Sequence, residues 1–292
     1  MNDRAPVVHP FRHAGTGTWS YVVADAATGR AAVIDPVLDF DIASARTSTA
    51  SAQALVDCVQ AGGYGVDWLL ETHAHADHLS AAQWLKQVHW PDARVAIGEG
   101  IRSVQARFRD VFDLGPDFPV DGSQFDHLFG ADDAFAIGGI ACRAIPVPGH
   151  TSDSCAYLVG DALFVGDSLF MPDAGTARCD FPGGDAATLY RSIRRLFAEL
   201  PDATRVFVCH DYGPGGREPA CETTIGAQKR DNIHVRVGLD EAGFVATREA
   251  RDASLAMPAL IIPSVQVNIR GGALPDPHAN GLRYLEFPLD AL

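Results

Sequence analysis

Short hydrophobic runs alternate along the chain with stretches in which hydrophobic positions recur every three or four residues. The runs 19–25 and 30–35 flank Thr28-Gly29, and this spacing predicts a β-hairpin. The clearest helical pattern, 186–200, places leucine, isoleucine and phenylalanine on one face. Other helices are predicted near 49–61, 79–89, 99–112 and 245–256, strands at 94–97 and 205–209, and mostly strands and turns over 117–165. The pattern as a whole predicts a protein of the α/β class.

One predicted strand ends in an unusual concentration of histidine. The apolar run 66–70 is followed by the segment His73-Ala74-His75-Ala76-Asp77-His78. Alternation would put the first two histidines and the aspartate on one side of an extended segment, and the last histidine follows where a helix begins. Imidazole and carboxylate groups are ligands of zinc and of non-haem iron. The segment therefore predicts a metal site.

Three more candidate ligands follow later strands. They are His150, Asp167 and His210, and each comes where an apolar strand gives way to a loop. A single histidine is most often an ordinary surface or core residue. Four such segments at strand ends together indicate a site built on one edge of a sheet. Asp35 also ends a strand, and we expect its role to be structural.

Charge and composition limit the partners and the location. The chain has 292 residues, is 47% hydrophobic, and carries 23 basic against 37 acidic side chains, for a net charge of −14. This balance argues against nucleic acid or an anionic membrane as a partner. The N-terminus has no apolar segment and no run approaches the length of a membrane span, so we expect a cytoplasmic protein. Six cysteines without a CxxC pair predict no disulfide framework.

The ordered ligand segments resemble the metallo-β-lactamase superfamily. The matching motifs are His73-x-His75-x-Asp77-His78, Pro148-Gly149-His150-Thr151, Gly166-Asp167 and His210. The resemblance covers roughly 15–235 and implies an αββα sandwich with the metal site at one edge. We expect residues 1–292 to form a single domain, with 238–292 as a packed C-terminal extension; a homodimer is left open. Because this superfamily includes hydrolases, nucleases and oxygenases, the resemblance does not fix the chemistry.

Two branches of the family remain in contention, both acting on glutathione conjugates. A glyoxalase-II-type thioesterase uses all seven ligands to hold two metal ions, zinc among them, which activate a hydroxide. A persulfide dioxygenase holds one Fe(II) and oxidises glutathione persulfide with O₂ to sulfite and glutathione. Its iron ligands correspond here to His73, His150 and Asp167, a facial triad that leaves three positions open. The remaining four, His75, Asp77, His78 and His210, would then orient ligands or move protons.

Residues beside the ligands favour the dioxygenase. Arg178-Cys179-Asp180-Phe181 resembles the Arg-x-Asp-Phe of that branch, and His210-Asp211-Tyr212 matches its His-Asp-Tyr. The thioesterases carry Gly-His-Glu-Tyr at the second position. Ala74 and Ala76 also suit the dioxygenase pattern. The sequence therefore predicts a persulfide dioxygenase, with the binuclear thioesterase as the alternative.

The resemblance also implies how the substrate is held. Arg178 would bind the tripeptide, and Tyr212 would hydrogen-bond near the sulfur. Lys229 and Arg230 fall where the family places a carboxylate-binding cation, although an ordinary solvated helix face is the alternative for both. His234 stands where an arginine would be expected. The residue that holds the glycine carboxylate is therefore left open.

Overall fold

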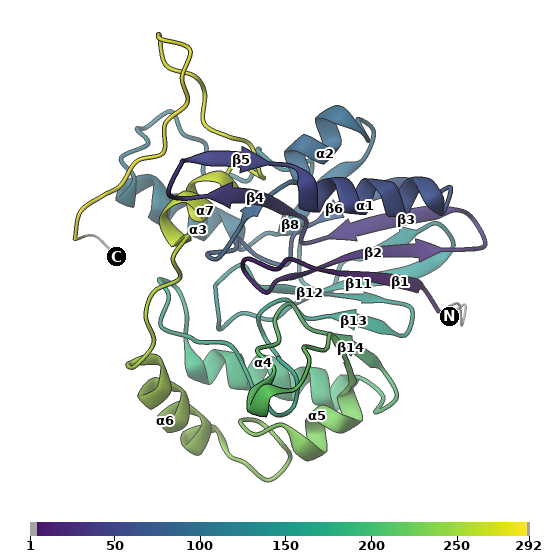
Figure 1. Ribbon diagram of the computed structural model, residues 1–292. Helices are drawn as coiled ribbons and strands as arrows, with labels where there is room; N and C mark the ends of the chain where they lie inside the picture. Colours follow the sequence, from purple (N-terminus) through teal and green to yellow (C-terminus); the bar gives the residue numbers. More distant parts are fainter. Residues whose placement is uncertain (1–4, 291–292) are drawn as a thin grey trace.

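Two β-sheets packed face to face form the centre of the protein, and helices cover both outer faces (Figure 1). The computed structural model describes residues 5–290, and within them each of these sheets has six strands. The first sheet has the order β1 (Val7–Arg12), β2 (Trp19–Asp25), β3 (Arg30–Ile34), β6 (Gly65–Leu70), β8 (Arg94–Gly98), β9 (His127–Phe129). The second has the order β10 (Ala134–Ile137), β11 (Ile140–Pro146), β12 (Cys155–Val159), β13 (Ala162–Phe164), β14 (Arg205–Phe207), β15 (Glu222–Thr224). A smaller sheet joins β5 (Arg46–Ser48), β4 (Val37–Asp41) and β7 (Leu79–Ser80).

Strand direction decides where the site lies. The pair β2–β3 is antiparallel and confirms the predicted hairpin. By contrast β3, β6, β8 and β9 run parallel to one another, and β13 runs parallel to β14. Parallel strands end at the same edge of a sheet, so the loops that follow them meet there. The loops after β3, β6, β13 and β14 carry most of the candidate ligands.

The helices form two outer layers. The first sheet is covered by α1 (Ala50–Ala61), α2 (Ala82–Val88), α3 (Ile101–Val111) and α7 (Ile261–Asn268). The second is covered by α4 (Ala186–Glu199), α5 (Ile225–Asp231) and α6 (Glu241–Asp252). Between the sheets, aromatic side chains such as Tyr21, Phe164 and Phe207 pack edge to face or stacked. The predicted αββα sandwich is confirmed.

Most predicted helices are present, and two differences have clear causes. The segment 79–89 begins as strand β7, because Leu79 and Ser80 pair with β4, and its helix starts only at Ala82. Such pairing with a distant strand cannot be read from local sequence. Helix α6, predicted near 245–256, begins earlier, at Glu241. The Asp240 side chain accepts a hydrogen bond from the Gly243 N–H and so caps the helix at this point.

The C-terminal part of the chain joins the two helical layers. After α6 it runs along one side of the molecule to α7, which lies over the first sheet (Figure 1). On this path the Ala256 carbonyl accepts a hydrogen bond from Arg178, and the Ile269 carbonyl accepts one from Gln105. The extension therefore contacts both halves of the sandwich. No helix within 5–290 has the length and apolar character needed to cross a bilayer.

Candidate metal centre

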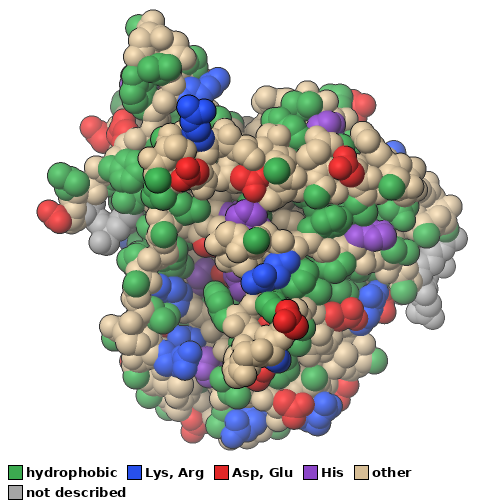
Figure 2. Space-filling view, viewed as in Figure 1, with side chains coloured by type: hydrophobic (Ala, Val, Ile, Leu, Met, Phe, Trp, Pro, Cys, Tyr) green, Lys and Arg blue, Asp and Glu red, His purple; other side chains and the backbone are tan. Residues whose placement is uncertain are grey.

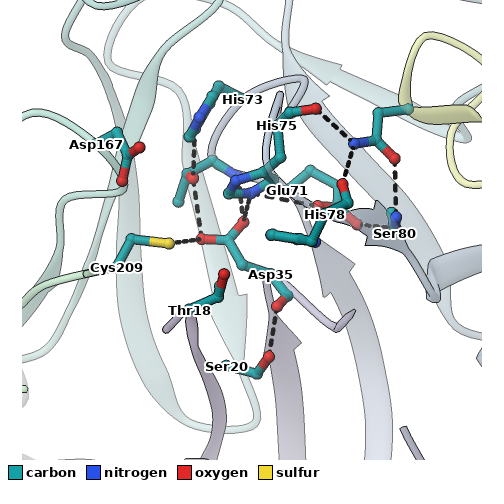
Figure 3. Close-up of polar contacts among 12 residues, drawn as sticks. Thr18, Ser20, Asp35, Glu71, His73, His75, His78, Ser80, Asp167 and Cys209 are labelled. Carbon is teal, nitrogen blue, oxygen red and sulfur yellow. Dashed lines mark hydrogen bonds and ion pairs between the residues drawn. The ribbon is translucent and has the colours of Figure 1, made fainter. Parts of the chain in front are cut away.

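All seven candidate ligands meet at one edge of the sandwich. The loop after β6 supplies His73, His75, Asp77 and His78, and later loops supply His150, Asp167 and His210. Figure 3 shows several of them converging, with Asp167 facing the histidines from the opposite sheet. Side chains from loops of both sheets therefore lie close together at this edge.

Six of the seven candidate ligands belong to two groups of neighbouring donor atoms. His73, His150 and Asp167 offer atoms that all lie within 4.8 Å of one another, and His75, Asp77 and His78 form a second such group. Asp167 Oδ2 lies 3.7 Å from His150 Nε2. The seventh residue bridges the groups, since His210 Nε2 lies 3.3 Å from Asp77 Oδ2 and 3.5 Å from Asp167 Oδ1.

Hydrogen bonds fix which ring nitrogen each histidine presents. His150 Nδ1 donates to the Arg178 carbonyl at 2.7 Å, and His78 Nδ1 donates to the Leu79 carbonyl at 3.1 Å. The Thr72 hydroxyl donates to Asp35 Oδ2 at 2.9 Å, so its oxygen accepts from His73 Nδ1 at 3.0 Å. In all three rings the lone pair is therefore on Nε2, as a metal ligand requires.

Several buried atoms at this edge have no hydrogen-bond partner among the described residues. They include His73 Nε2, His75 Nδ1, His78 Nε2, Asp167 Oδ1 and His210 Nδ1. Buried polar atoms normally have partners, so a cluster of orphaned nitrogen and oxygen donors requires an explanation. A divalent cation supplies one, because imidazole and carboxylate are its ordinary ligands. The residues present fit a bound metal ion.

Burial and mutual repulsion keep the presented imidazoles neutral. Burial, reinforced by the neighbouring histidines, lowers the pKa of His73 well below its usual value. Burial and the charge on His75 lower the pKa of His78 to about 3. Neutral imidazole is the form that binds metal, so both side chains are ready ligands at neutral pH.

His75 is engaged differently. Its Nε2 lies 3.0 Å from Asp35 Oδ1 and 3.8 Å from Glu71 Oε2, and all three side chains are buried (Figure 3). Burial lowers the pKa of His75, but Asp35 outweighs it, with help from Asp77 and Glu71, and raises that pKa to about 10. The segment is an irregular loop and not the extended strand expected, but its side chains do lie together: the ring centroids of His73 and His75 are 4.0 Å apart, and His75 Nδ1 lies 3.9 Å from Asp77 Oδ1. The prediction that a helix begins at His78 is wrong, because His78 precedes strand β7.

Cys209 reaches the same edge without joining the ligands. It falls within 4.8 Å of the donors of Asp167 and His210. Burial raises the pKa of its thiol well above the usual value. Only the thiolate is a good metal ligand, so Cys209 acts here as a small buried side chain.

Comparison with known proteins agrees with this geometry. A family model described as the metallo-beta-lactamase superfamily matches residues 14–210. The chain belongs to this superfamily. It is 51% identical over 289 residues to a Xylella fastidiosa protein named beta-lactamase hydrolase-like protein, covering 99% of this chain but only 66% of that one. It is also 43% identical over 294 residues to glyoxylase B2 of Dictyostelium discoideum, covering 100% of this chain and 99% of the relative.

Two further likenesses involve proteins named ETHE1. The mouse protein named persulfide dioxygenase ETHE1 is 26% identical over 262 residues, covering 89% of this chain and 86% of that one. The crystal structure of ETHE1 from Myxococcus xanthus superposes with a TM-score of 0.71 at 29% identity, covering 91% of this chain and all of the other. Membership of this superfamily and the clustered donors identify the protein as a metal-binding enzyme with the metallo-β-lactamase fold.

A cavity of about 710 Å³ leads from the surface to the metal-binding edge. Its floor includes Asp77, His150, Asp167 and His210, and its walls include the rings of Phe170, Phe181 and Tyr212. In Figure 2 histidine surface is visible within the hollow, with basic side chains beside it. Tyr212 is 69% exposed and its ring lies parallel to that of His210, with the ring centroids 6.1 Å apart. The volume suits a ligand of tripeptide size.

The predicted substrate cations differ in position. Arg178 lines the cavity, but Asp180 pairs with its Nε and Nη2 at 2.6 Å, and its Nη1 donates to the Ala256 carbonyl. Lys229 and Arg230 do not line the cavity: Lys229 is held by Asp202 at 2.6 Å, and Arg230 is exposed on α5. These two residues therefore fit the alternative reading, an ordinary solvated helix face.

Helix α6 supplies two cavity cations that the sequence reading did not identify. Arg248 is 3% exposed, pairs with Asp252 at 2.7 Å and donates to the Thr176 carbonyl. Arg251 lines the cavity, is exposed, and has no carboxylate partner within 5–290. Their spacing of three on one helix was a visible signal, but nothing local placed that helix over the cavity. His234 is buried beneath this region, where its Nδ1 accepts from the Thr176 N–H.

Replacing Gly149 by alanine is expected to destabilise the fold strongly. Gly149 has φ +137°, and a Cβ there would lie 2.3 Å from the backbone nitrogen of Leu189 in α4. The clash and the strained backbone should together lower the free energy of unfolding by about 3 kcal/mol or more. Gly63→Ala is the control, since Gly63 has φ +64° but no atom within 4 Å of the added Cβ. Thermal unfolding of both apoproteins gives the comparison, and equal losses would contradict the steric explanation.

Proposed function

We propose that this protein is a persulfide dioxygenase that uses one iron ion held by His73, His150 and Asp167. The observation that carries the proposal is the grouping of two histidines and one carboxylate, whose donor atoms all lie within 4.8 Å of one another. Such a triad leaves three adjacent positions for substrate and O₂. Iron bound there would supply the redox chemistry that amino-acid side chains lack. The similarity to the mouse persulfide dioxygenase and to the Myxococcus ETHE1 structure supports the same assignment.

The engagement of His75 supports a single metal ion. In a two-metal centre, all three histidines of the His-x-His-x-Asp-His segment would be ligands. Here His75 Nε2 lies 3.0 Å from Asp35 Oδ1. The donor atoms of His73, His150 and Asp167 instead lie close to one another. Asp35 thus serves two histidines, holding His75 directly and His73 through the Thr72 hydroxyl. With Nε2 engaged by Asp35, His75 has only Nδ1, 3.9 Å from Asp77 Oδ1, to offer to a second metal ion.

The proposed reaction consumes glutathione persulfide, one O₂ and one water, and yields glutathione and sulfite. Both atoms of O₂ and the water oxygen end on the terminal sulfur, and the thiol of glutathione takes up a proton. Phe170 and Phe181 give the cavity apolar walls that limit water near the reacting sulfur. The His210–Asp77 pair, 3.3 Å apart beside Asp167, can hold or pass a proton.

Arg251 is the cavity cation best suited to a substrate carboxylate. Arg178 and Arg248 are each paired with an aspartate, whereas Arg251 has no such partner within the described chain. A protein of net charge −14 needs a local cation to attract an anionic tripeptide. We therefore assign the carboxylate contact to Arg251 rather than to Lys229 or Arg230.

Arg251→Gln is expected to raise KM for glutathione persulfide about 5- to 10-fold, because a charged hydrogen bond is lost. The turnover number should change less than about 2-fold, since Arg251 lies at the cavity wall and not among the metal donors. Arg236→Gln is the matched control: Arg236 is exposed and lies outside the cavity. Steady-state kinetics on both variants decide the point, and equal KM values would remove Arg251 from the substrate site.

A binuclear metallohydrolase is the second candidate. The group of His75, Asp77 and His78 provides a second set of donors, and Asp167 lies between His150 and His210 as a bridging carboxylate would. The names of the Xylella and Dictyostelium relatives, hydrolase-like protein and glyoxylase, also point this way. Two zinc ions and a glutathione thioester substrate would follow from this assignment.

The two candidates differ in their need for oxygen. Anaerobic and air-saturated samples of one iron-loaded preparation should be offered glutathione persulfide and, separately, S-lactoylglutathione. The dioxygenase should consume persulfide only in the presence of O₂ and leave the thioester intact. Thioester hydrolysis at equal rate with and without O₂, from protein holding two metal ions per chain, would establish the hydrolase instead.

A further inference from the structure

The metal-binding loop after β6 is irregular, and its backbone is held from two sides. On the core side, Asp35 Oδ1 accepts from the Thr72 N–H at 2.7 Å, and Asp153 Oδ2 accepts from the Ala74 N–H at 2.8 Å. Both carboxylates are buried. These contacts fix the first part of the loop around His73. Neither of these hydrogen bonds involves the second part of the loop, toward His78.

A single side chain from the C-terminal extension holds the second part of the loop. Asn268, the last residue of α7, donates from its amide nitrogen to the carbonyls of His75 and His78, each at 2.8 Å. Its amide oxygen accepts from the Ser80 N–H at 2.8 Å. Asn268 is 4% exposed. Both N–H donors of the amide and its carbonyl are therefore in use, and all three partners belong to the metal-binding loop and the strand that follows it.

These contacts give hydrogen-bond partners to backbone carbonyls of the loop. Its carbonyls belong to no regular ladder, and buried backbone carbonyls require a partner. Packing nearby is equally close: Gly272 has φ +88°, and a Cβ there would lie 3.0 Å from Ser80 Oγ. Asn268 comes nearly 60 residues after the end of the family match at residue 210. The loop is thus completed by a segment that lies beyond the residues matched by the family model.

We propose that Asn268 is a positioning residue of the metal centre. By fixing the carbonyls of His75 and His78, it sets the path of the second part of the loop, and so the place of the donor atoms that this part carries beside His73. The strength of metal binding then depends on the docking of α7. This inference rests on the presence of a metal ion at the site and holds for either proposed reaction.

Gln266 provides a matched control on the same helix. It is 1% exposed, its amide donates to the carbonyls of Ile262 and Glu286 at 2.9 Å, and its oxygen accepts from the Glu286 N–H. Asn268 and Gln266 are therefore both buried amides with three hydrogen bonds. Only the bonds of Asn268 reach the metal-binding loop.

The experiment compares metal affinity in Asn268→Ala and Gln266→Ala. Dissociation constants for Zn²⁺ and, without oxygen, for Fe²⁺ are measured by competition with a chromophoric chelator, and apoprotein melting temperatures are recorded alongside. Asn268→Ala should bind metal about 10-fold or more weakly, as is typical when a group that orients ligands is lost. Gln266→Ala should lower the melting temperature similarly but change metal affinity less than about 2-fold. Wild-type affinity in Asn268→Ala would overturn the proposal. Failure of the wild-type protein itself to bind metal would instead contradict the metal centre.

Hydrogen exchange on the unmodified protein tests the coupling even where Asn268→Ala does not fold. Linkage is reciprocal: if docking of α7 strengthens metal binding, metal binding must stabilise the docked α7. Adding Zn²⁺ to the wild-type apoprotein should therefore slow exchange in peptides spanning 261–272 as well as in the loop. Slowing confined to the loop and to the other ligand segments would overturn the proposal.

Discussion

Replacing Asp167 by alanine is expected to give a folded protein that holds less than about one tenth of an iron ion per chain. Its activity should fall by about 10³-fold or more. Asp167 is the only carboxylate in the first donor group, and it lies within 3.7 Å of His150 Nε2 and 3.5 Å of His210 Nε2. Two neutral imidazoles alone bind a hard divalent cation weakly. Iron content by elemental analysis and sulfite production by the same sample provide the measurement.

Asp173→Ala is the control for a general loss of negative charge at the cavity. Asp173 also lines the cavity but pairs with Arg217 at 2.5 Å and belongs to no donor group. It should keep close to one iron per chain. An Asp167→Ala protein that keeps full iron and full activity would contradict the assignment of this metal site.

The second large effect separates two neighbouring histidines. His73→Gln should lose iron as Asp167→Ala does, because its orphaned Nε2 is a proposed ligand. His75→Gln should retain about one iron per chain with at most about a 100-fold loss of affinity or activity, as expected for a group that only orients others. The glutamine amide can still donate to Asp35, which the ring now contacts at 3.0 Å.

The comparison also tests the competing two-metal site. If both histidines are ligands of one metal in a binuclear centre, the two variants should lose metal and activity to the same extent. Equal losses would therefore favour the hydrolase. Melting temperatures of the apoproteins show whether a loss of iron reflects the ligand or the fold, since His75 is wholly buried between two carboxylates.

The sequence was sufficient to predict the edge at which the ligands meet. Each ligand segment follows a strand. Because β3, β6 and β8 are parallel, as are β13 and β14, their ends lie at the same edge of each sheet. The hydrophobic period also predicted α1, α3 and α4 closely, because each buries a regular apolar face. These features depend on local pattern, which sequence carries directly.

The division of the seven ligands could not be predicted in the same way. Alternation applies to an extended strand, but the loop after β6 is irregular, and its side chains take directions set by distant partners. Asp35 determines where His75 points, and Asn268 holds the backbone beside it. Such contacts join residues far apart in sequence, and periodicity contains no information about them.

The substrate side shows the same limit. Lys229 and Arg230 were placed by resemblance, yet the turn of α5 directs them away from the cavity and toward Asp202 and solvent. The capped start of α6 instead brings Arg248 and Arg251 to the cavity wall. Helix register and docking, rather than the order of residues, decide which cation reaches a substrate.

The most direct measurement is oxygen uptake by the Fe(II)-loaded protein on addition of glutathione persulfide, with sulfite determined in the same sample. A persulfide dioxygenase would take up O₂ rapidly and form about one sulfite per O₂, as the balanced reaction requires. No uptake by protein confirmed to hold iron at His73, His150 and Asp167 would contradict the proposed function.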